Sequence, residues 1–270
     1  RGNSYYGLGD YEEAKSDFTR AIRIDPDDVL AYHNRGLSNN GLENYEEAIA
    51  DYTRAIMIDP DYADAYYNRG NSYYGLGDYE EAIADYTRAI KIDPDYFSAY
   101  WSRGYLYDGL ENYEEAISDY TRAISINPDY ADSYLKRGNS YLSLGNFKDA
   151  IADFTRTIMI DPDYVDAYYN RGYLYHELGN YEDAISDFTR AIRIDPDFVA
   201  AYFNRGLSYS GLGNYEEAIA DYTRAISINP DYVDSYFNRG LSYYRLRNYE
   251  EAKSDFTRTI RIDPDYVDAY

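Results

Sequence analysis

The chain has 270 residues, a formal net charge of -23 and no cysteine. The absence of cysteine excludes disulfides, thiol chemistry and thiolate metal sites, and an acidic surface disfavours nucleic acid and anionic membranes as partners. No apolar run approaches the roughly 20 residues that span a bilayer, so we predict neither nucleic-acid binding nor membrane insertion.

The eight prolines recur at a fixed spacing of 34 residues, from Pro26 to Pro264. A constant period of this size is typical of a solenoid of stacked repeats. We predict one domain, a single array over residues 1–270, with a partial repeat at 1–28 and the start of another at 267–270. The full repeats are 29–62, 63–96, 97–130, 131–164, 165–198, 199–232 and 233–266.

Each repeat predicts two amphipathic helices, as the copy at 63–96 illustrates. Apolar and small residues recur at helical spacing from Tyr66 to Leu76 and again from Ala82 to Ile90. Between them, Gly77 can adopt the left-handed conformation that ends the first helix. One helix pair cannot bury its apolar stripe alone, so stacking on neighbouring repeats is expected.

Helix caps are predicted from the same copy. Asp78 stands at the start of the second helix, and Glu81 three residues later completes a pattern typical of a capping box. Pro94 stops the second helix, since proline cannot continue it. Asp95 is then expected to cap the first helix of the next repeat.

The motif of the repeat resembles that of the tetratricopeptide repeat family, and the resemblance covers the whole chain. It is carried in this copy by Tyr66, Gly70, Tyr73, Gly77, Tyr79, Ala82, Tyr86, Ala89 and Pro94. The resemblance implies an all-α fold, a right-handed superhelical solenoid of antiparallel helix pairs. It also implies protein-protein interaction rather than catalysis.

An arginine precedes the core glycine of every repeat, where the family usually has a large apolar residue; Arg69 before Gly70 is one example. Burying an unpaired charge is costly, so we predict that this arginine reaches an aspartate of the second helix, such as Asp85, in a ladder of ion pairs. The alternative is that the aliphatic part of the arginine side chain packs on tyrosine while its guanidinium lies in water. Asp85 and Arg88, three residues apart, are expected to pair locally.

Three repeats depart from the pattern at the helix turn, and the one at 233–266 has Arg247 there. The repeat at 29–62 has Asn39 in place of the core tyrosine and Glu43 in place of the turn glycine, and we expect it to be among the less stable repeats. The repeat at 97–130 has Glu111 at the turn and holds the only tryptophan, Trp101.

Catalytic and metal chemistry find little support. The two histidines lie four repeats apart, and no phosphate loop or nucleophile motif is present. Asp59, Asp61 and Asp64 form the strongest calcium candidate, but a capping and solvated role is favoured for them. We therefore predict no enzyme activity, no metal and no cofactor.

The resemblance implies that first helices line a concave groove that receives extended peptides. Asparagine amides can pair with a peptide backbone, and aromatic neighbours add contact area. The alternative is that the asparagines only solvate the groove while the aromatic residues are half-buried packing. The predicted ligand-binding residues are Asn34, Asn68, Asn170, Asn204, Asn238, Tyr67, Trp101, Tyr169, Phe203 and Phe237.

Two functions remain open from the sequence. The first is a non-enzymatic scaffold that binds an extended polypeptide in the groove. The alternative is a structural protein whose uniform repeats stack head to tail into a filament or longer superhelix, because unclosed heterologous contacts propagate. The expected partner is a protein or peptide, or in the second case another copy of the chain; the sequence indicates no localisation.

Overall fold

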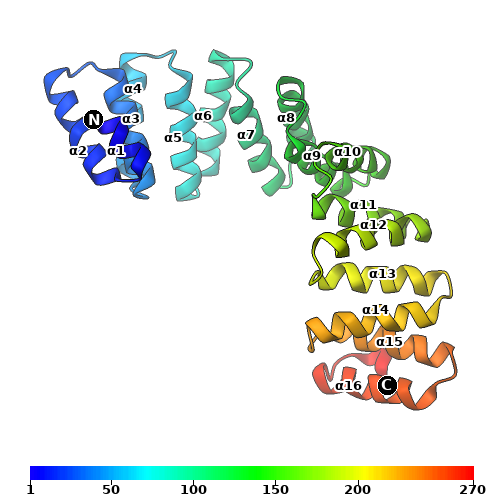
Figure 1. The fold of residues 1–270 in the computed structure, drawn as a ribbon. Helices are drawn as coiled ribbons and strands as arrows, with labels where there is room; N and C mark the ends of the chain where they lie inside the picture. The colour runs from blue at the N-terminus through cyan, green and yellow to red at the C-terminus, as the bar shows by residue number, and fades with distance from the viewer. The chain divides into compact units, whose positions relative to one another are not determined.

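The computed structural model describes all residues from Arg1 to Tyr270 and contains 16 α-helices, one short 3-10 helix and no strand (Figure 1). The all-α prediction is therefore confirmed. None of the helices combines the length and the apolar character that crossing a membrane demands.

Helices alternate along the chain as the first and second helices of successive repeats. The first helices are α1 (Gly2–Leu8), α3 (Val29–Gly41), α5 (Ala63–Leu76), α7 (Phe97–Gly109), α9 (Ala131–Ser143), α11 (Val165–Glu177), α13 (Val199–Gly211) and α15 (Val233–Arg245). The second helices are α2 (Tyr11–Ile24), α4 (Tyr45–Ile58), α6 (Tyr79–Ile92), α8 (Tyr113–Ile126), α10 (Phe147–Ile160), α12 (Tyr181–Ile194), α14 (Tyr215–Ile228) and α16 (Tyr249–Ile262). The 3-10 helix η1 (Val267–Ala269) follows α16.

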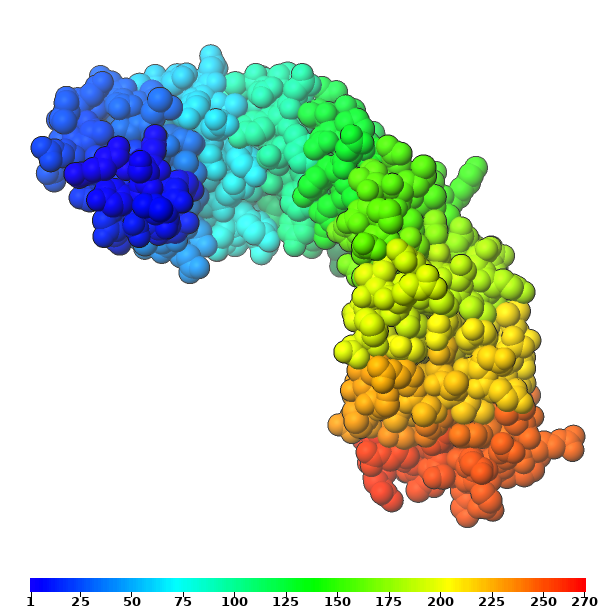
Figure 2. Space-filling view, viewed as in Figure 1, coloured from blue at the N-terminus to red at the C-terminus, as the bar shows by residue number.

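The chain forms two compact units, which we call unit 1 (Arg1–Leu144) and unit 2 (Gly145–Tyr270). Within each unit a helix packs mainly on the helices next to it in sequence, and first helices of adjacent repeats also touch, as α3 touches α5 and α13 touches α15. Figure 2 shows this within each unit, since the surface colours follow one another in chain order. A single array over 1–270 stays a prediction.

The turn between the two helices of a repeat has the predicted left-handed residue. Gly77 ends α5 with φ +83°. Three repeats lack this glycine, and Glu43, Glu111 and Arg247 there take φ values of +59°, +61° and +63°. A side chain in this region costs about 1 kcal/mol, so these turns are strained by the fold around them.

The predicted side-chain caps are wrong. Asp78 stands at the N-cap of α6 but makes no capping hydrogen bond. The residue at the N-cap of α7 is Tyr96, while the Asp95 amide donates to Asp93 Oδ1 at 3.0 Å. The side chain of the aspartate before the proline, which is Asn127 or Asn229 in two repeats, thus accepts a hydrogen bond from an amide of its own turn. An aspartate does cap α3, where the Ala31 amide donates to Asp28 Oδ1 at 3.0 Å.

The two helices of a repeat cross closely at small residues. A Cβ on Gly70 would lie 2.7 Å from Tyr86 Cε1, and Ala82 and Tyr86 are both buried. The missing side chain lets the tyrosine ring sit against the backbone of α5, which fixes how the two helices pack. The small residues thus set the close crossing of the two helices.

The predicted ladder of arginine–aspartate pairs is present in both units. In α5 the Arg69 guanidinium donates to both carboxylate oxygens of Asp85, at 2.7 and 2.8 Å, and a third bond reaches Thr53 Oγ1 in the preceding repeat at 2.9 Å. Each guanidinium of this kind therefore ties its own helix pair to the repeat before it. The pairs are Arg35–Asp51, Arg69–Asp85, Arg103–Asp119, Arg171–Asp187, Arg205–Asp221 and Arg239–Asp255.

The expected local pair between Asp85 and Arg88 is wrong. Asp85 is taken by Arg69, and Arg88 instead lies 3.8 Å from Asp61 at the preceding turn. The ring of Tyr66 has the Arg69 guanidinium at 5.6 Å and the Arg88 guanidinium at 5.7 Å from its centroid. Stacking on tyrosine, the alternative to the ladder, thus accompanies the ion pair rather than replacing it.

Candidate functional site

We call the surface formed by the first helices of a unit its first-helix face. In unit 1 it carries four of the predicted binding residues, all half-buried: Asn34 on α3, Tyr67 and Asn68 on α5, and Trp101 on α7. The Asn68 amide nitrogen lies 3.0 Å from His33 Nε2 and donates to the Asp64 carbonyl at 2.9 Å. Its donors are therefore used within the chain.

Tyr67 is a packing residue of this face. Its ring centroid lies 5.7 Å from that of Tyr86 and 5.2 Å from that of Tyr96, and its hydroxyl is 3.5 Å from Ser102 Oγ. These contacts join one helix pair to the next repeat. They favour the half-buried packing role that the sequence left as the alternative.

Trp101 differs from Tyr67, although it holds the same place one repeat later. Its ring stacks on Tyr105 with centroids 5.6 Å apart and an angle of 10° between the planes. The indole Nε1 is buried and has no hydrogen-bond acceptor in the chain. An unpaired buried donor of this kind is costly.

A cavity of about 440 Å³ opens beside Trp101, and we call it the Trp101 cavity. Three successive first helices, α5, α7 and α9, build it together with one residue of α6. Tyr74 and Tyr105 are 42% and 39% exposed, so their rings offer free surface. The lining residues are Asn71, Tyr74, Tyr86, Trp101, Ser102, Tyr105, Asp132 and Lys136.

Among the lining residues, only Trp101 was predicted from the sequence to bind a ligand. Asn71 and Tyr105 follow Asn68 and Trp101 by one helical turn, at spacings of three and four residues. Side chains at these spacings share a helix face. Extending the predicted positions along each first helix by one turn would have found both residues.

The cavity is polar at its rim and contains one cation. The Lys136 ammonium lies 5.3 Å from the centroid of the Tyr105 ring, and the Asp132 carboxylate lines the same cavity. The Tyr86 hydroxyl donates to Asn71 Oδ1 at 2.8 Å. Burial, and secondarily the neighbouring Tyr105, raises the pKa of Tyr74, so this phenol is neutral at pH 7. The cavity therefore offers neutral aromatic surface beside one ammonium and one carboxylate.

In unit 2 the first-helix face carries the other six predicted residues, again half-buried. The Asn204 amide donates to Tyr169 Oη and to the Ala200 carbonyl, both at 3.0 Å. The Asn238 amide donates to the Asp234 carbonyl at 2.8 Å. Asn170 lies on α11. The asparagine donors seen here serve the chain itself, as in Asn68.

The aromatic residues of unit 2 also pack within the stack. The Tyr169 ring lies 4.9 Å from Phe198, the Phe203 ring 5.1 Å from Tyr232, and the Phe237 ring 4.9 Å from Tyr266, between centroids. Each contact joins a ring on a first helix to the residue that precedes the first helix of the next repeat. These rings therefore hold adjacent repeats together.

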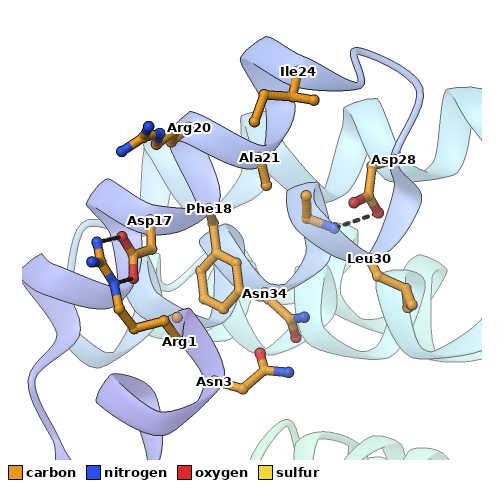
Figure 3. A pocket seen from close by; sticks show the side chains of 12 residues that line it. Arg1, Asn3, Asp17, Phe18, Arg20, Ala21, Ile24, Asp28, Leu30 and Asn34 are labelled. Atoms are coloured by element: carbon orange, nitrogen blue, oxygen red, sulfur yellow. Dashed lines mark hydrogen bonds and ion pairs between the residues drawn. The ribbon is translucent and has the colours of Figure 1, made fainter.

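A larger cavity of about 620 Å³ lies between α1, α2 and α3 (Figure 3). Figure 3 shows Arg1 paired with Asp17 on one side of it, and Phe18 and Asn34 pointing towards it. Helix α1 begins at Gly2, whereas α5 begins seven residues before the equivalent glycine, at Ala63. The cavity occupies the place that these opening turns fill in other repeats, so it is a feature of repeat geometry.

The calcium candidate does not form a cluster. Asp59 Oδ1 accepts from the Asp61 amide at 3.1 Å, Asp61 faces Arg88, and the Tyr96 hydroxyl donates to Asp64 at 2.5 Å. No group of three acidic or histidine side chains is arranged to hold a metal ion. The three carboxylates therefore have separate partners. Asp59 binds within the turn, Asp61 pairs with Arg88, and Asp64 binds Tyr96 of the following turn.

Solved structures of related fold support the helix-pair arrangement. YrrB, described as a TPR protein with an unusual peptide-binding site, is 28% identical, with a TM-score of 0.62 over 68% of this chain and 95% of that chain. MamA is 27% identical, with a TM-score of 0.60 over 63% of this chain and 92% of that chain. A comparison with curated protein sequences finds no match.

A third structure shows the fold alone. The C-terminal part of a TPR repeat-containing protein from Cytophaga hutchinsonii is 19% identical, with a TM-score of 0.75 over 87% of this chain and 96% of that chain. It extends the structural likeness to most of the chain.

Family models match nearly the whole sequence. One described as Tetratricopeptide repeat matches residues 63–96, 165–198 and 233–266. A second, described as TPR repeat, matches 2–41, 42–77, 109–145, 138–179 and 209–246, and another tetratricopeptide model matches 188–220. The chain therefore belongs to the tetratricopeptide repeat family.

Proposed function

We propose that this chain is a non-enzymatic interaction scaffold that binds an extended polypeptide along the first-helix face of unit 1. The observation that carries the proposal is the Trp101 cavity, because three consecutive first helices line it and its tyrosine rings are partly free. Clefts with aromatic walls and a few polar groups are typical of binding sites. Family membership and the peptide-binding site named for YrrB support the same class of function.

Catalysis finds no support in the hydroxyl groups. Thr53 accepts a hydrogen bond from Arg69 as part of the ladder. His176 Nδ1 is 3.0 Å from Ser208 Oγ, but Ser208 is fully buried and donates to the Asn204 carbonyl. A nucleophile needs access to substrate and an available base, and this serine has no such access.

The proposal is tested by selecting peptides from a random displayed library against the purified chain and mapping where they bind. A photo-crosslinking amino acid at Asn71 reports on the first-helix face. The same amino acid at Met57, which is 67% exposed on the second helix α4, is the matched control within unit 1.

We expect selected peptides to crosslink through position 71 and not through position 57. Crosslinking only through position 57, or a selection that enriches no peptide, would contradict the proposal. The design places both probes in one unit, so the result does not depend on how the two units are arranged.

The second candidate is end-to-end stacking of copies. It is favoured by the uniform 34-residue repeats, whose helices pack on those of the adjacent repeats, because heterologous contacts that do not close propagate. Filaments seen by electron microscopy at rising protein concentration would favour this candidate, and discrete particles at all concentrations would exclude it.

A further inference from the structure

We propose that the Trp101 cavity is an anchor site for proline, and that it selects net-basic, extended peptides with a proline residue at the anchor position. This inference rests on the proposed function, because it assigns a side-chain class to the peptide that the first-helix face would bind. It names the chemistry of the partner, which neither the family nor the related structures assign.

The walls of the cavity match a compact ring. The rings of Trp101 and Tyr105 stack with nearly parallel planes. The Tyr74 ring meets the Tyr105 ring edge to face, with centroids 6.4 Å apart and an angle of 71° between the planes. Aromatic-lined grooves take proline because its ring is rigid and already restricted before binding. Little side-chain entropy is then lost when the ring enters.

The charges of the site disfavour ionic side chains as the anchor. A lysine or arginine stacked on Tyr105 would lie beside the Lys136 ammonium, which already sits 5.3 Å from that ring centroid. A carboxylate would lie beside the Asp132 carboxylate of the lining, in the field of a chain with net charge -23. The same field favours basic residues outside the cavity, on the flanks of the peptide. A neutral anchor with basic flanks satisfies both conditions.

The backbone chemistry of proline suits a closely lined site. The lining holds the Lys136 ammonium and the Asp132 carboxylate beside the aromatic rings. A proline residue brings no backbone N–H. Leucine or phenylalanine at the same position would add a backbone donor that needs an acceptor of its own. Proline therefore complements the site in shape and in having a neutral side chain.

The position of Lys136 makes the selectivity testable. The equivalent residues on other first helices include Asn34, Asn68, Asn170, Asn204 and Asn238. The Lys136→Asn variant therefore restores a residue that this repeat position already accommodates. If the ammonium is what excludes cations, the variant admits an arginine anchor that the native protein rejects.

The experiment uses the single tryptophan, Trp101, as the reporter. Peptides of glycine, serine and lysine carry a central Pro-Pro, Leu-Leu, Phe-Phe, Arg-Arg or Glu-Glu pair, and each is titrated into the full chain by tryptophan emission and calorimetry. We expect the Pro-Pro peptide to shift the emission and to bind about tenfold more tightly than the next best peptide.

Matched variants locate the effect. Tyr105→Asn introduces the residue found at the equivalent Asn71 and should weaken Pro-Pro binding about tenfold or more. Tyr173→Asn makes the same change at the equivalent position of unit 2 and should leave it unchanged. Lys136→Asn should strengthen binding of the Arg-Arg peptide while changing Pro-Pro binding less. Circular dichroism confirms that each variant is folded.

Several outcomes would overturn the inference. Equal affinity for Pro-Pro, Leu-Leu and Phe-Phe would show a general apolar site, and preference for Arg-Arg or Glu-Glu in the native protein would show that the charge argument is wrong. Calorimetric binding with no change in Trp101 emission, and none from Tyr105→Asn, would overturn the anchor site while leaving peptide binding intact. Library peptides that crosslink through Asn71 but lack proline would separate the two proposals in the same way.

Discussion

The first-helix faces of the two units carry equivalent positions but use them differently. In unit 2 the aromatic residues of this row make ring contacts between adjacent repeats; they are Tyr169, Phe203 and Phe237. In unit 1 the same row contains Trp101, whose ring lies 6.4 Å from that of Tyr130 but also stacks on the partly exposed Tyr105 at the edge of a cavity. The difference shows that repeats with a common framework diverge at surface positions, where substitution alters the exposed surface without altering the fold.

The framework itself is the same in both units. Arg69 and Arg205 bind their aspartates with nearly identical distances, 2.7 to 2.8 Å, and each also donates to a threonine of the preceding repeat. Variants made in matched pairs, one in each unit, therefore test whether this framework is equivalent while the faces differ. The predictions follow in order of decreasing expected effect.

The largest effect is expected from removing a ladder carboxylate. Asp85→Ala leaves the mostly buried Arg69 guanidinium without its partner, and we expect a loss of about 3 kcal/mol in the free energy of unfolding. Asp221→Ala should have a similar effect in unit 2. Asp61→Ala removes an exposed partner of Arg88 and should cost under about 1 kcal/mol. Urea unfolding followed by circular dichroism measures all three, and equal effects of Asp85→Ala and Asp61→Ala would contradict the ladder's role.

A smaller effect is expected from crowding the helix crossing. In Gly70→Ala and Gly206→Ala the new Cβ would lie 2.7 Å from a tyrosine ring carbon, whereas in Gly104→Ala the nearest atom is 3.2 Å away. Overpacking costs about 1–3 kcal/mol, so the first two should lie near the upper end and the third near the lower end. Thermal melting ranks them, and a Gly104→Ala variant as damaged as Gly70→Ala would show that the ring does not set the helix separation.

Replacing the strained turn residues with glycine should increase stability modestly. Glu43→Gly in unit 1 and Arg247→Gly in unit 2 remove the strain of a positive φ, which is about 1 kcal/mol. Glycine also increases the conformational entropy of the unfolded chain, which offsets part of this gain. We expect each to raise the free energy of unfolding by roughly 0.5 kcal/mol. A decrease in both variants would mean that the side chains contribute contacts that outweigh the strain. The lower stability expected for repeat 29–62 stays a prediction, and its Asn39 does find a partner in Asp51 at 3.0 Å.

The smallest effect concerns pH and the two histidines. Burial lowers the pKa of His33 in unit 1, with Asp64 partly opposing, and burial also lowers the pKa of His176 in unit 2. The unfolded histidine binds a proton near pH 6.5, so the stability that each neutral imidazole maintains above that pH is lost as the pH falls below it. His33→Tyr should reduce the loss of stability between pH 7.5 and 5.5 more than His176→Gln, since His33 is more buried. Identical pH profiles for native and His33→Tyr proteins would show that His33 does not titrate in this way.

Much of the fold followed from local rules in the sequence. The 34-residue period and helical spacing located the helix pairs, and Gly77 was identified as the left-handed turn residue because few residues adopt positive φ at low cost. The ladder was also predictable, because an arginine at a packed position requires a nearby carboxylate. Its exact partners came from a simple inventory of acidic residues on the second helix.

The errors arose where several side chains competed for one partner. Asp85 was expected to bind Arg88 because they are close in sequence. It binds Arg69 of the neighbouring helix instead. Asp95 was expected as a cap, but its amide is bound by Asp93 within the proline turn. Tyr105 could have been found one helical turn after Trp101, but its contact with Lys136 could not, since the two residues come from different repeats and meet only through the stacking geometry. The roles of the predicted groove residues in ligand binding remain proposals.

The most direct test of the account is acrylamide quenching of Trp101 fluorescence with and without the Pro-Pro peptide. Because Trp101 is the single tryptophan, its quenching constant reports only on the cavity. The account predicts that the constant falls as the peptide saturates, and that Tyr105→Asn abolishes the fall while Tyr173→Asn preserves it. An unchanged constant at peptide concentrations where calorimetry shows saturation would contradict the account.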